Sequence, residues 1–546
     1  MLKRKKMPDE KIFVHVCQGT GCISGGAERV FNKFKDLAGS SVNDSKIVIK
    51  KTGCHGFCQQ GPLIVVEPHG FFYTKVKEDD VEEILNSFEH DKKPVARLFY
   101  HDPVTEQIIP KYNDIPFYKL QDRTILKHCG NIDPEDIQDY ISVGGYKALK
   151  RAVTEITPDE IIQEIKKSGL RGLGGAGFPT GKKWESCRNA QGNIKYVICN
   201  ADEGDPGAFQ DRSVMEGNPH SVIEGMIIAA YAIGAQKGFI YVRAEYPLAV
   251  SRLKIAIEQA REEGFLGENI LDNRFNFDIE IFQGAGAFVC GESTALVRSM
   301  EGKRGMPKPM PRSRTTEEGL WNNPTLLNNV KTFANIPLII NNGAEWFFSK
   351  GTDKCKGTAV FSLTGKVMNC GLIEVPMGIT LRKIIYEIGG GIAGSKKLKA
   401  VQTGGPSGGC IPPDLLDMRV DFDSLKEAGT IMGSGGMVIM DEDTCMVDVA
   451  RYFLDFTQRE SCGQCIPCRL GTVQMFRILD DITKGKGRKG DIDFLLELSE
   501  SIMKGSICGL GKTAPNPVLT TIRYFRDEYE AHINDKKCPA KICAMQ

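Results

Sequence analysis

The chain has 546 residues, enough for about three or four domains, and 70 lysines and arginines balance 69 aspartates and glutamates. This balance argues against nucleic acid or an anionic membrane surface as a partner. The basic opening MLKRKK is not followed by an apolar segment, so we expect no signal peptide, and no apolar run of about 18 residues predicts a membrane span. We therefore expect a cytoplasmic protein whose 18 cysteines serve metal or redox chemistry rather than disulfides.

Four cysteines near the start form two close pairs: Cys17 and Cys22 in CQGTGC, and Cys54 and Cys58 in GCHGFC. Between the pairs, AERVFNKFKDLAG has a helical pattern, and GPLIVVEPHGFFYTKV afterwards has a strand–turn–strand pattern. These features predict a small α/β domain with a [2Fe–2S] cluster, because glycines beside the thiolates let backbone N–H groups approach the sulfides. Structural zinc is the alternative, although zinc usually prefers C-x2-C turns.

A glycine-rich stretch, RGLGGAGFPTGKKW (171–184), contains the G-x-G-x-x-G fingerprint of dinucleotide-binding turns. Such a turn follows a strand, but TPDEIIQEIKKSGL (157–170) has the capping box, the N1 proline and the apolar spacing of a helix. We therefore expect a variant loop that binds a flat, phosphorylated ligand, with Lys182 and Lys183 as cationic donors. A flexible surface loop is the alternative.

Two further segments carry candidate ligand residues. A predicted strand, IKYVICN (194–200), ends where α/β proteins place ligand loops. Its end is crowded by Asn200, Asp202, Glu203 and Asp205. In QGAGAFVCGESTALVRSMEGKR (283–304), a glycine-rich loop precedes a predicted helix whose N-terminus at Ser293 would offer free N–H groups to a phosphate. TLLNNVKT adds Asn328 and Asn329.

The C-terminal part contains a second cysteine cluster. SCGQCIPCRLG places Cys462, Cys465 and Cys468 as C-x2-C-x2-C, and Cys508 follows in SICGLG. Three close thiolates and a remote fourth predict a [4Fe–4S] cluster. The flanking segments VDVARYFLDFTQRE and DFLLELSESIMKG have helical apolar spacing, which predicts a helical bundle around the cluster.

The remaining cysteines carry weaker signals. The final segment contains His532, Cys538 and Cys543, which provide three zinc ligands with no fourth nearby, so an unliganded tail is the alternative. Eight cysteines are scattered singly, and we expect most of them to serve ordinary packing. They are Cys129, Cys187, Cys199, Cys290, Cys355, Cys370, Cys410 and Cys445.

Five motifs, in this order, resemble the NADH-binding flavoprotein subunit of respiratory NADH–quinone oxidoreductase: RGLGGAGFPTGKKW, NADEGDPGAF, GAGAFVCGES, TLLNNV and ESCGQCIPCRLG. The N-terminal cysteine pairs resemble the thioredoxin-like [2Fe–2S] module in beta subunits of [FeFe]-hydrogenases, formate dehydrogenases and related electron-bifurcating complexes. The resemblance covers nearly the whole chain. It implies a multidomain α/β protein with a thioredoxin-like domain, a Rossmann-like FMN domain, a β-grasp domain and a C-terminal helical bundle with an iron–sulfur cluster.

The resemblance also implies boundaries. We expect a [2Fe–2S] domain at 1–95, a connecting arm at 96–155, an FMN and NAD(P)-binding domain at 156–350, a β-grasp domain at 351–432, a helical [4Fe–4S] domain at 433–530, and a tail with possible metal ligands at 531–546.

Site roles follow from the same resemblance. The residues implied to hold FMN are Gly172, Gly174, Gly175, Lys183, Asn200, Asp202, Glu203, Gly291, Glu292, Asn328 and Asn329. Phe178 is implied to stack near the nicotinamide nucleotide, with Asp205 close to it. No side chain is required as a catalytic acid or base.

One departure from the family concerns the nucleotide. Respiratory relatives usually read G-E-E-T where this chain has Gly291-Glu292-Ser293-Thr294, and K-P-P-F-P-A where it has PRSRTT (311–316). The missing glutamate would repel a 2′-phosphate, which carries about −1.5 to −2 charges, whereas Arg312 and Arg314 can bind one. We hypothesise that NADP(H) is favoured over NAD(H). The alternative is that both arginines only coat an exposed loop.

The implied reaction is hydride exchange between nicotinamide and FMN, followed by one-electron transfer through the clusters. The implied setting is a multisubunit, electron-bifurcating complex with other redox subunits and ferredoxin, as in hydrogenase, formate dehydrogenase or ferredoxin transhydrogenase. Bifurcating relatives often continue past a segment like KKCPAKIC into a ferredoxin domain, so we expect such clusters in a partner. The alternatives are an NADH-specific dehydrogenase module of respiratory type and a zinc-stapled scaffold without redox activity.

Overall fold

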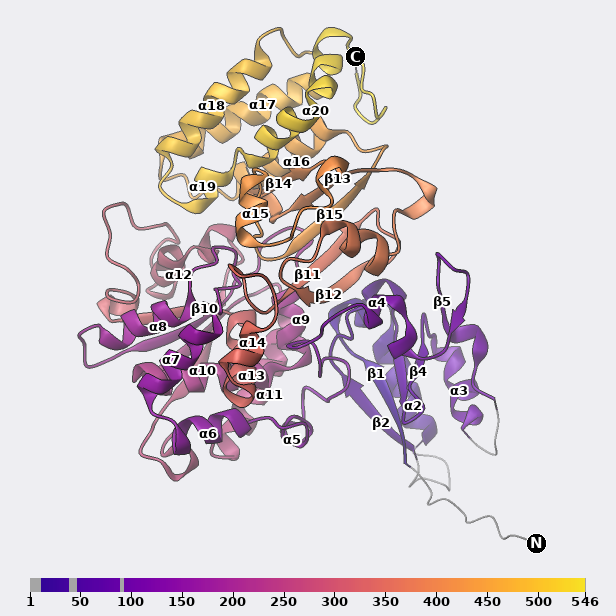
Figure 1. The fold of residues 1–546 in the computed structure, drawn as a ribbon, viewed down its shortest axis with the longest axis vertical. Coiled ribbons are helices and arrows are strands. Elements are labelled where there is room, and N and C mark those ends of the chain that lie inside the picture. The colour runs from indigo at the N-terminus through magenta and orange to yellow at the C-terminus, as the bar shows by residue number, and fades with distance from the viewer. Residues whose placement is uncertain (1–10, 39–46, 89–92, 546) are drawn as a thin grey trace.

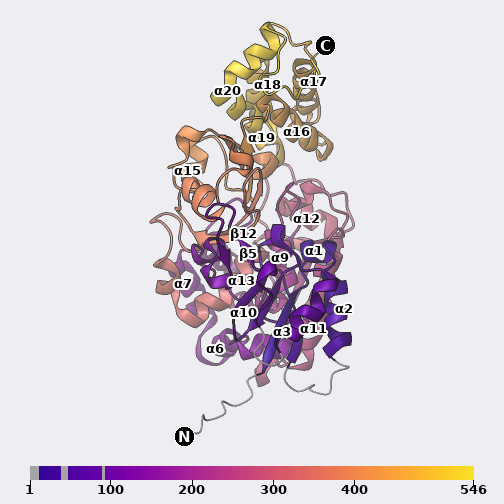
Figure 2. The same ribbon diagram turned by 90° about the vertical axis from the view of Figure 1, so that its right-hand side faces the viewer.

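The computed structural model describes residues 11–38, 47–88 and 93–545; the basic opening segment MLKRKK therefore lies outside the described residues. Figure 1 shows an N-terminal α/β unit beside a larger α/β unit, a further sheet above them, and helices at the C-terminal end. The same helices form one end of the molecule in the perpendicular view of Figure 2. Within the described ranges, no helix is long and apolar enough to span a membrane.

The N-terminal unit is a four-stranded mixed sheet in the order β2-β1-β3-β4. Its strands are β1 (Ile12–Cys17), β2 (Ile47–Thr52), β3 (Ile64–Glu67) and β4 (Phe71–Tyr73). The predicted helix is α2 (Ala27–Ala38), which buries Val30, Phe31 and Phe34 against the sheet, and β3 and β4 are the predicted hairpin. Short α1 (Thr20–Ser24) and α3 (Val81–Ser87) complete the unit. Both local predictions are confirmed.

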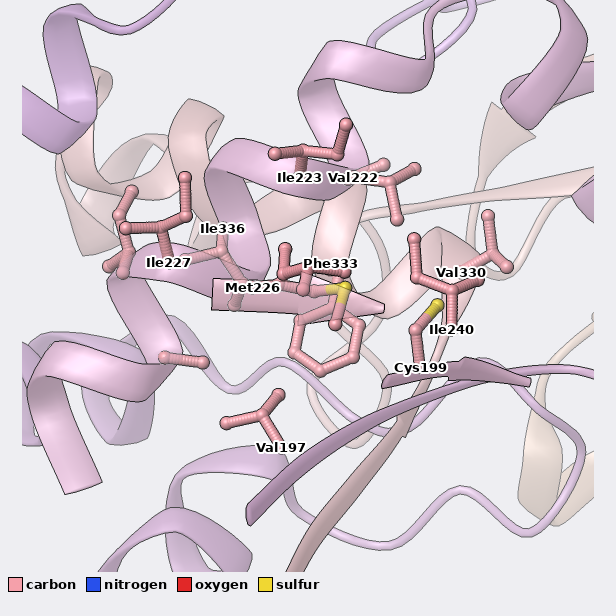
Figure 3. Packing of buried hydrophobic residues seen from close by; sticks show 14 of the residues in the cluster. Val197, Cys199, Val222, Ile223, Met226, Ile227, Ile240, Val330, Phe333 and Ile336 are labelled. Atoms are coloured by element: carbon pink, nitrogen blue, oxygen red, sulfur yellow. The ribbon is translucent and has the colours of Figure 1, made fainter. Parts of the chain in front are cut away.

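The larger unit is built on a four-stranded sheet in the order β10-β7-β8-β9, in which every pair is parallel. Its strands are β7 (Tyr196–Ala201), β8 (Lys237–Arg243), β9 (Asp278–Gly284) and β10 (Thr325–Asn329). Figure 3 shows α10 (Pro219–Ile233) and α13 (Val330–Asn342) packing side chains such as Met226 and Phe333 toward Val197 of the sheet. Both helices bury apolar side chains against the sheet, and this packing holds the strands in place. The candidate ligand loops begin at the carboxyl ends of these strands.

The helix before the glycine-rich loop is confirmed. It is α7 (Pro158–Ser168), whose N-cap Thr157 and Glu160 form the expected capping box. The helix stops at Gly169, whose φ of 72° is favourable for glycine, and α8 (Thr180–Asn189) follows the loop. The glycine loop therefore joins two helices, and the fingerprint does not mark a strand-to-helix turn.

A second mixed sheet follows in the order β12-β11-β15-β13-β14. Its strands are β11 (Thr358–Gly365), β12 (Gly371–Pro376), β13 (Leu398–Thr403), β14 (Gly409–Ile411) and β15 (Gly436–Asp441). We refer to this unit, with α15 (Phe422–Glu427), as the five-stranded domain. Its buried Glu374 accepts hydrogen bonds from the backbone N–H groups of Thr124 (2.8 Å) and Leu126 (3.0 Å), which anchors the segment that connects the two preceding units.

The C-terminal unit consists of helices that share one apolar core. Its helices are α16 (Met446–Arg459), α17 (Thr472–Thr483), α18 (Asp491–Gly505), α19 (Gly509–Thr513) and α20 (Asn516–Asn534). Thus α16 and α18 are the helices that the flanking segments predict. The other helices and strands are β5 (Tyr100–His101), β6 (Ile108–Ile109), α4 (Pro116–Lys119), α5 (Ile137–Ser142), α6 (Lys147–Glu155), α9 (Gln210–Gly217), α11 (Pro247–Glu262), α12 (Ser293–Met300) and α14 (Ala344–Phe348).

Removing the Glu374 carboxylate should destabilise the junction between the connecting segment and the five-stranded domain. We expect Glu374→Ala to cost about 2–3 kcal/mol, since buried N–H donors lose their acceptor, and to lower the thermal midpoint by about 4–12 °C in calorimetry. Glu374→Gln keeps one acceptor oxygen and should lose less. Glu345→Ala, an exposed change on α14, is the matched control; equal shifts in the two alanine variants would contradict the anchoring role.

Candidate functional site

A cavity of about 540 Å³ lies where the glycine loop, the end of β7 and the loop before α12 face the five-stranded domain. This volume is typical of small-molecule and cofactor sites. The cavity brings together many of the residues that the sequence singled out: Gly174, Gly175, Asn200, Asp202, Glu203, Asp205, Gly291, Glu292 and Asn329. Other predicted residues do not line it, namely Gly172, Phe178, Lys183, Ser293, Arg312, Arg314 and Asn328.

The main chain of the glycine loop packs directly against the main chain of the five-stranded domain. Gly175 has a φ of 111°, and a Cβ atom there would lie 3.2 Å from the carbonyl carbon of Gly433. Because glycine needs no space beyond its backbone, both loops can expose N–H groups to the cavity. The cavity wall formed by Gly404, Ser407, Phe422, Gly433 and Ser434 was not predicted. The glycine runs QTGGPSGGC and GSGG were the available signal for it.

The carboxylates in the cavity have unusual surroundings. Both oxygens of Asp202 are buried and have no hydrogen-bond partner among the described residues, and burial raises the pKa of Asp202 to about 7. Burial also raises the pKa of Glu203 to about 7, while its carboxylate accepts the backbone N–H groups of Asp211 (2.9 Å) and Arg212 (3.1 Å). A ligand with hydroxyl or ring N–H donors would satisfy Asp202, so this side of the cavity fits a flavin.

Lys183 lies beside β10, where its Nζ donates to the carbonyl oxygen of Leu327 at 2.9 Å. Burial lowers its pKa to about 8, and Trp184 donates its indole N–H to the Asn328 side chain at 3.3 Å. A half-buried ammonium with a neutral acceptor is suited to an anionic group such as a phosphate. The proposed phosphate role of Lys183 stays a prediction.

The expectation of free N–H groups at the start of α12 is wrong. Glu292 is the N-cap residue, and its carboxylate accepts the backbone N–H groups of Thr294 and Ala295, each at 3.0 Å. The same carboxylate pairs with Arg312 at 3.0 Å, so Arg312 is already engaged, whereas Arg314 is exposed. A capping glutamate satisfies the helix terminus from within the protein, which the glycine-rich pattern alone does not reveal.

The N-terminal cysteines converge. Cys17, Cys22 and Cys54 are buried and Cys58 is half-buried, with 3.6 Å between the sulfurs of Cys54 and Cys58. A hydrogen bond from the Cys22 thiol lowers the pKa of Cys17 to about 7, which indicates that these two sulfurs also lie close together. Four thiols from two loops at one place match a cluster site.

This cysteine site is attached directly to the larger α/β unit. Thr20, between Cys17 and Cys22, donates its backbone N–H to Glu216 at 2.9 Å, and a Cβ on Gly53 would lie 2.0 Å from the Cα of Gly217. Glu216 and Gly217 end α9, while Asp211 near its start lines the cavity. Six residues of helix correspond to about 9 Å. One short helix therefore separates the cysteine site from the cavity.

The C-terminal cysteines approach the same cavity from another direction. Burial raises the pKa of Cys468 to about 11, and the charges of Cys465, Cys508 and Cys462 act on it in the same sense, so the four sulfurs lie near one another. The residues after Cys508 begin α19, and Gly509, Leu510 and Thr513 line the cavity. The cavity thus lies between two cysteine quartets.

A third group of residues that could hold a metal ion lies at the C-terminal end, and we refer to it as the Cys445 set. The ligand atoms of Cys445, His532, Cys538 and Cys543 all lie within 4.8 Å of one another. His532 has its Nδ1 2.7 Å from the Glu528 carbonyl oxygen, which leaves Nε2 facing Cys445 (3.5 Å) and Cys543 (3.4 Å). Three sulfurs and one imidazole are a typical tetrahedral zinc set.

Cys445 is the fourth ligand that the sequence did not reveal. We expected no fourth ligand nearby and assigned most single cysteines to packing, which is wrong for Cys445. It caps the start of α16 and is 87 residues from His532 in sequence, so only the fold brings the two together. Hydrogen bonding from Cys543 is the main cause that lowers the pKa of Cys445 to about 4, as suits a thiolate ligand.

Comparison with known proteins agrees with this arrangement. Three family matches divide the chain: Thioredoxin-like [2Fe-2S] ferredoxin at residues 3–89, Nuo51 FMN-binding domain at 165–338, and NADH-ubiquinone oxidoreductase-F iron-sulfur binding region at 448–532. The chain is 58% identical over 425 residues to NADP-reducing hydrogenase subunit HndC of Solidesulfovibrio fructosivorans, covering 78% of this chain and 86% of that protein.

Two further similarities cover most of the chain. An F-type subunit of the NADH-quinone oxidoreductase of Rhizobium meliloti is 45% identical over 412 residues, which is 75% of this chain and 98% of that protein. The crystal structure of an NAD+-reducing [NiFe]-hydrogenase in the H2-reduced state superposes with a TM-score of 0.68 at 29% identity, covering 97% of this chain and 85% of that chain.

A cavity that fits a flavin, set between two cysteine quartets, defines an NAD(P)H:acceptor oxidoreductase subunit with FMN, a [2Fe–2S] cluster and a [4Fe–4S] cluster. With the identities above, the chain belongs to the family of FMN- and iron–sulfur-containing flavoprotein subunits of NADH–quinone oxidoreductase. The resemblance drawn from the five motifs is confirmed. The domain boundaries and the individual ligand assignments stay predictions.

The Cys445 set should hold one zinc ion per chain. We expect metal analysis of the purified, full-length protein to find one equivalent of zinc, and Cys445→Ala to lose it, because three remaining ligands bind zinc far more weakly. The control is Cys187→Ala in α8, which should retain the zinc. Zinc retained in full by Cys445→Ala would contradict the assignment.

Proposed function

We propose that the chain is the NADP(H)-linked flavin subunit of a multisubunit, electron-bifurcating complex of the hydrogenase type, working with other redox subunits and ferredoxin in the cytoplasm. The observation that carries the proposal is the placement of the cavity between two cysteine quartets, reached through α9 on one side and α19 on the other. The similarity to a subunit of an NADP-reducing hydrogenase supports the choice of complex. Formate dehydrogenase and ferredoxin transhydrogenase complexes use related subunits.

Bound FMN supplies the conversion between two-electron hydride exchange and one-electron transfer. The chain's own residues bind and orient the reactants. Lys183 binds the phosphate, Asp202 accepts hydrogen bonds from the ligand, and Phe178, half of whose side chain is exposed, provides a stacking face for nicotinamide. The Asn200 amide donates to the Gly291 carbonyl oxygen at 3.0 Å and so holds the two ligand loops together.

The preference for NADP(H) rests on local charge. Ser293 is neutral, and Arg312 compensates the carboxylate of Glu292 through their 3.0 Å pair. A 2′-phosphate close to α12 therefore meets no uncompensated carboxylate from these residues, and the exposed Arg314 can reach it. The 45% identity to an NADH-quinone oxidoreductase subunit favours the second candidate, an NADH-specific module of respiratory type.

Two structural assignments complete the proposal. The five-stranded domain corresponds to the β-grasp domain that the resemblance implies at 351–432, with β15 (Gly436–Asp441) beyond that range, and it forms one wall of the cavity. The Cys445 set holds structural zinc, since zinc has no redox chemistry of its own.

Nucleotide preference can be measured with a viologen dye as acceptor. We expect the wild-type protein to have a higher kcat/KM for NADPH than for NADH. Ser293→Glu should reverse the ratio by at least about tenfold, or 1.4 kcal/mol, because a carboxylate would face the 2′-phosphate. Arg314→Met should lower kcat/KM for NADPH but not for NADH. Arg274 is also exposed, so Arg274→Met is the matched control. Faster turnover of NADH by the wild-type protein would reject the preference.

Binding of FMN should be accompanied by proton uptake at Lys183. With a pKa of about 8, this lysine is mostly neutral at pH 9, whereas a dianionic phosphate favours the ammonium form. Calorimetry at pH 9, in two buffers of different ionisation enthalpy, should detect uptake of nearly one proton by the wild-type apoprotein. Lys183→Met should bind at least about tenfold more weakly without uptake. Lys182 is the exposed neighbour, and Lys182→Met should take up as many protons as the wild type. If Lys183→Met also took up as many protons as the wild type, Lys183 would not be the group that is protonated.

A further inference from the structure

Lys331 on α13 places a buried cation directly behind the cavity. Only 2% of its side chain is exposed, and its Nζ lies 2.8 Å from a carboxylate oxygen of Asp211 and 3.0 Å from the carbonyl oxygen of Ser434. Asp211 and Ser434 both line the cavity, so Lys331 contacts the cavity wall from outside. A buried ammonium is costly unless it is paired, and the Asp211 carboxylate, itself 3% exposed, provides that pair.

The pair fixes an amide that also lines the cavity. Asn329 donates its Nδ2 to Asp211 at 2.6 Å, and its Oδ1 accepts the backbone N–H of Lys331 at 2.9 Å. The partner of the Lys331 ammonium therefore sets the Nδ2 end of the Asn329 amide, and the main chain of Lys331 sets the Oδ1 end, which together define the orientation of the side chain. A second N–H of the amide is left for a ligand in the cavity.

The same ammonium holds the five-stranded domain against the cavity. Its acceptor Ser434 also donates its hydroxyl to Asp205 at 2.5 Å, and the adjacent Gly433 faces Gly175 of the glycine loop. Lys331 thus connects α9, α13 and the loop of a different domain at one point. The sequence analysis missed it, although Lys331 directly follows the Asn328-Asn329 pair in TLLNNVKT.

Lys331 also affects the electrostatic potential of the cavity, because several carboxylates line the wall. Asp202, Glu203, Asp205 and Asp211 all line the cavity, and Lys331 acts against burial by lowering the pKa of Glu203 and of Asp205. Oxidised flavin that gains two electrons and one proton becomes an anion. A cation within a low-dielectric wall stabilises such an anion, whereas uncompensated carboxylates would oppose its formation.

We propose that Lys331 is a positioning residue for FMN: it closes the cavity wall through Asp211, Asn329 and Ser434, and its charge favours reduction of the bound flavin. The inference rests on FMN binding in this cavity. Beyond the proposed function, the inference names Lys331 as a group that shifts the reduction equilibrium of the bound flavin.

The test uses full-length protein reconstituted with FMN and both clusters. Lys331→Met should weaken FMN binding to the apoprotein by about tenfold, measured by flavin fluorescence. It should also lower the equilibrium constant for two-electron reduction by at least about tenfold, or 30 mV, measured by dye-equilibrated anaerobic titration. Lys331→Arg retains the charge and should keep the reduction constant within threefold of wild type. Lys350→Met, which breaks the Lys350–Asp122 pair away from the cavity, is the matched control.

A second variant covers the case in which Lys331→Met retains no flavin. Asp211→Asn removes the negative partner and should raise the reduction constant; a fall or no change would overturn the inference. A wild-type reduction constant in Lys331→Met, or an equal loss in Lys331→Arg, would overturn it as well. Failure of the wild-type apoprotein to bind FMN would instead overturn the flavin assignment itself, so the two failures are distinguishable.

Discussion

Direct contact between main chains holds the cofactor sites of this protein together. Gly53 of the N-terminal unit packs on Gly217 at the end of α9, and Gly175 of the glycine loop packs on Gly433 of the five-stranded domain. At the first contact a Cβ would overlap its neighbour, so any side chain would separate the units. Separation matters here because electron transfer requires short distances between cofactors that are bound in different domains. The first glycine contact therefore sets the distance between the N-terminal cysteine site and the cavity, and the second brings two parts of the cavity wall together.

Compensation of buried charge is the second constraint on the cavity. The wall contains several carboxylates, and three of them differ in how close their basic partner lies: Asp211 has Lys331 at 2.8 Å, Glu292 has Arg312 at 3.0 Å, and Asp202 has only Arg243 at 3.9 Å among the described residues. Burial of an uncompensated carboxylate raises its pKa, as it does for Asp202. The least compensated group is thus the one with the greatest need for a ligand donor. The paired groups, in contrast, shape the wall and set its electrostatic potential.

Local patterns in the sequence predicted local structure well. The capping box at Thr157 identified the start of α7, and this showed that the glycine loop follows a helix. Cysteine spacing indicated both cluster sites because their ligands occur as close pairs or triplets in the sequence. The sequence failed where a contact joins distant segments: Cys445 meets His532 only after α16 and α20 pack together, and Ser434 reaches Lys331 across a domain boundary. It failed as well at the start of α12, where Glu292 accepts the N–H groups that we expected to be free, because the glycine-rich pattern does not reveal a capping side chain.

Helix α16 relates the proposed zinc set, made of Cys445, His532, Cys538 and Cys543, to the [4Fe–4S] site. Cys445 caps its first turn, and the chain leaves its other end at Arg459, shortly before Cys462. Its 14 residues extend about 21 Å, so the two metal sites lie at opposite ends of one helix. Zinc has no accessible redox change, and at this separation its charge has little effect on the cluster. The role we propose for zinc is mechanical: ligands from α16, α20 and the tail would fix the end of the bundle, and a fixed α16 would position the loop that carries Cys462, Cys465 and Cys468.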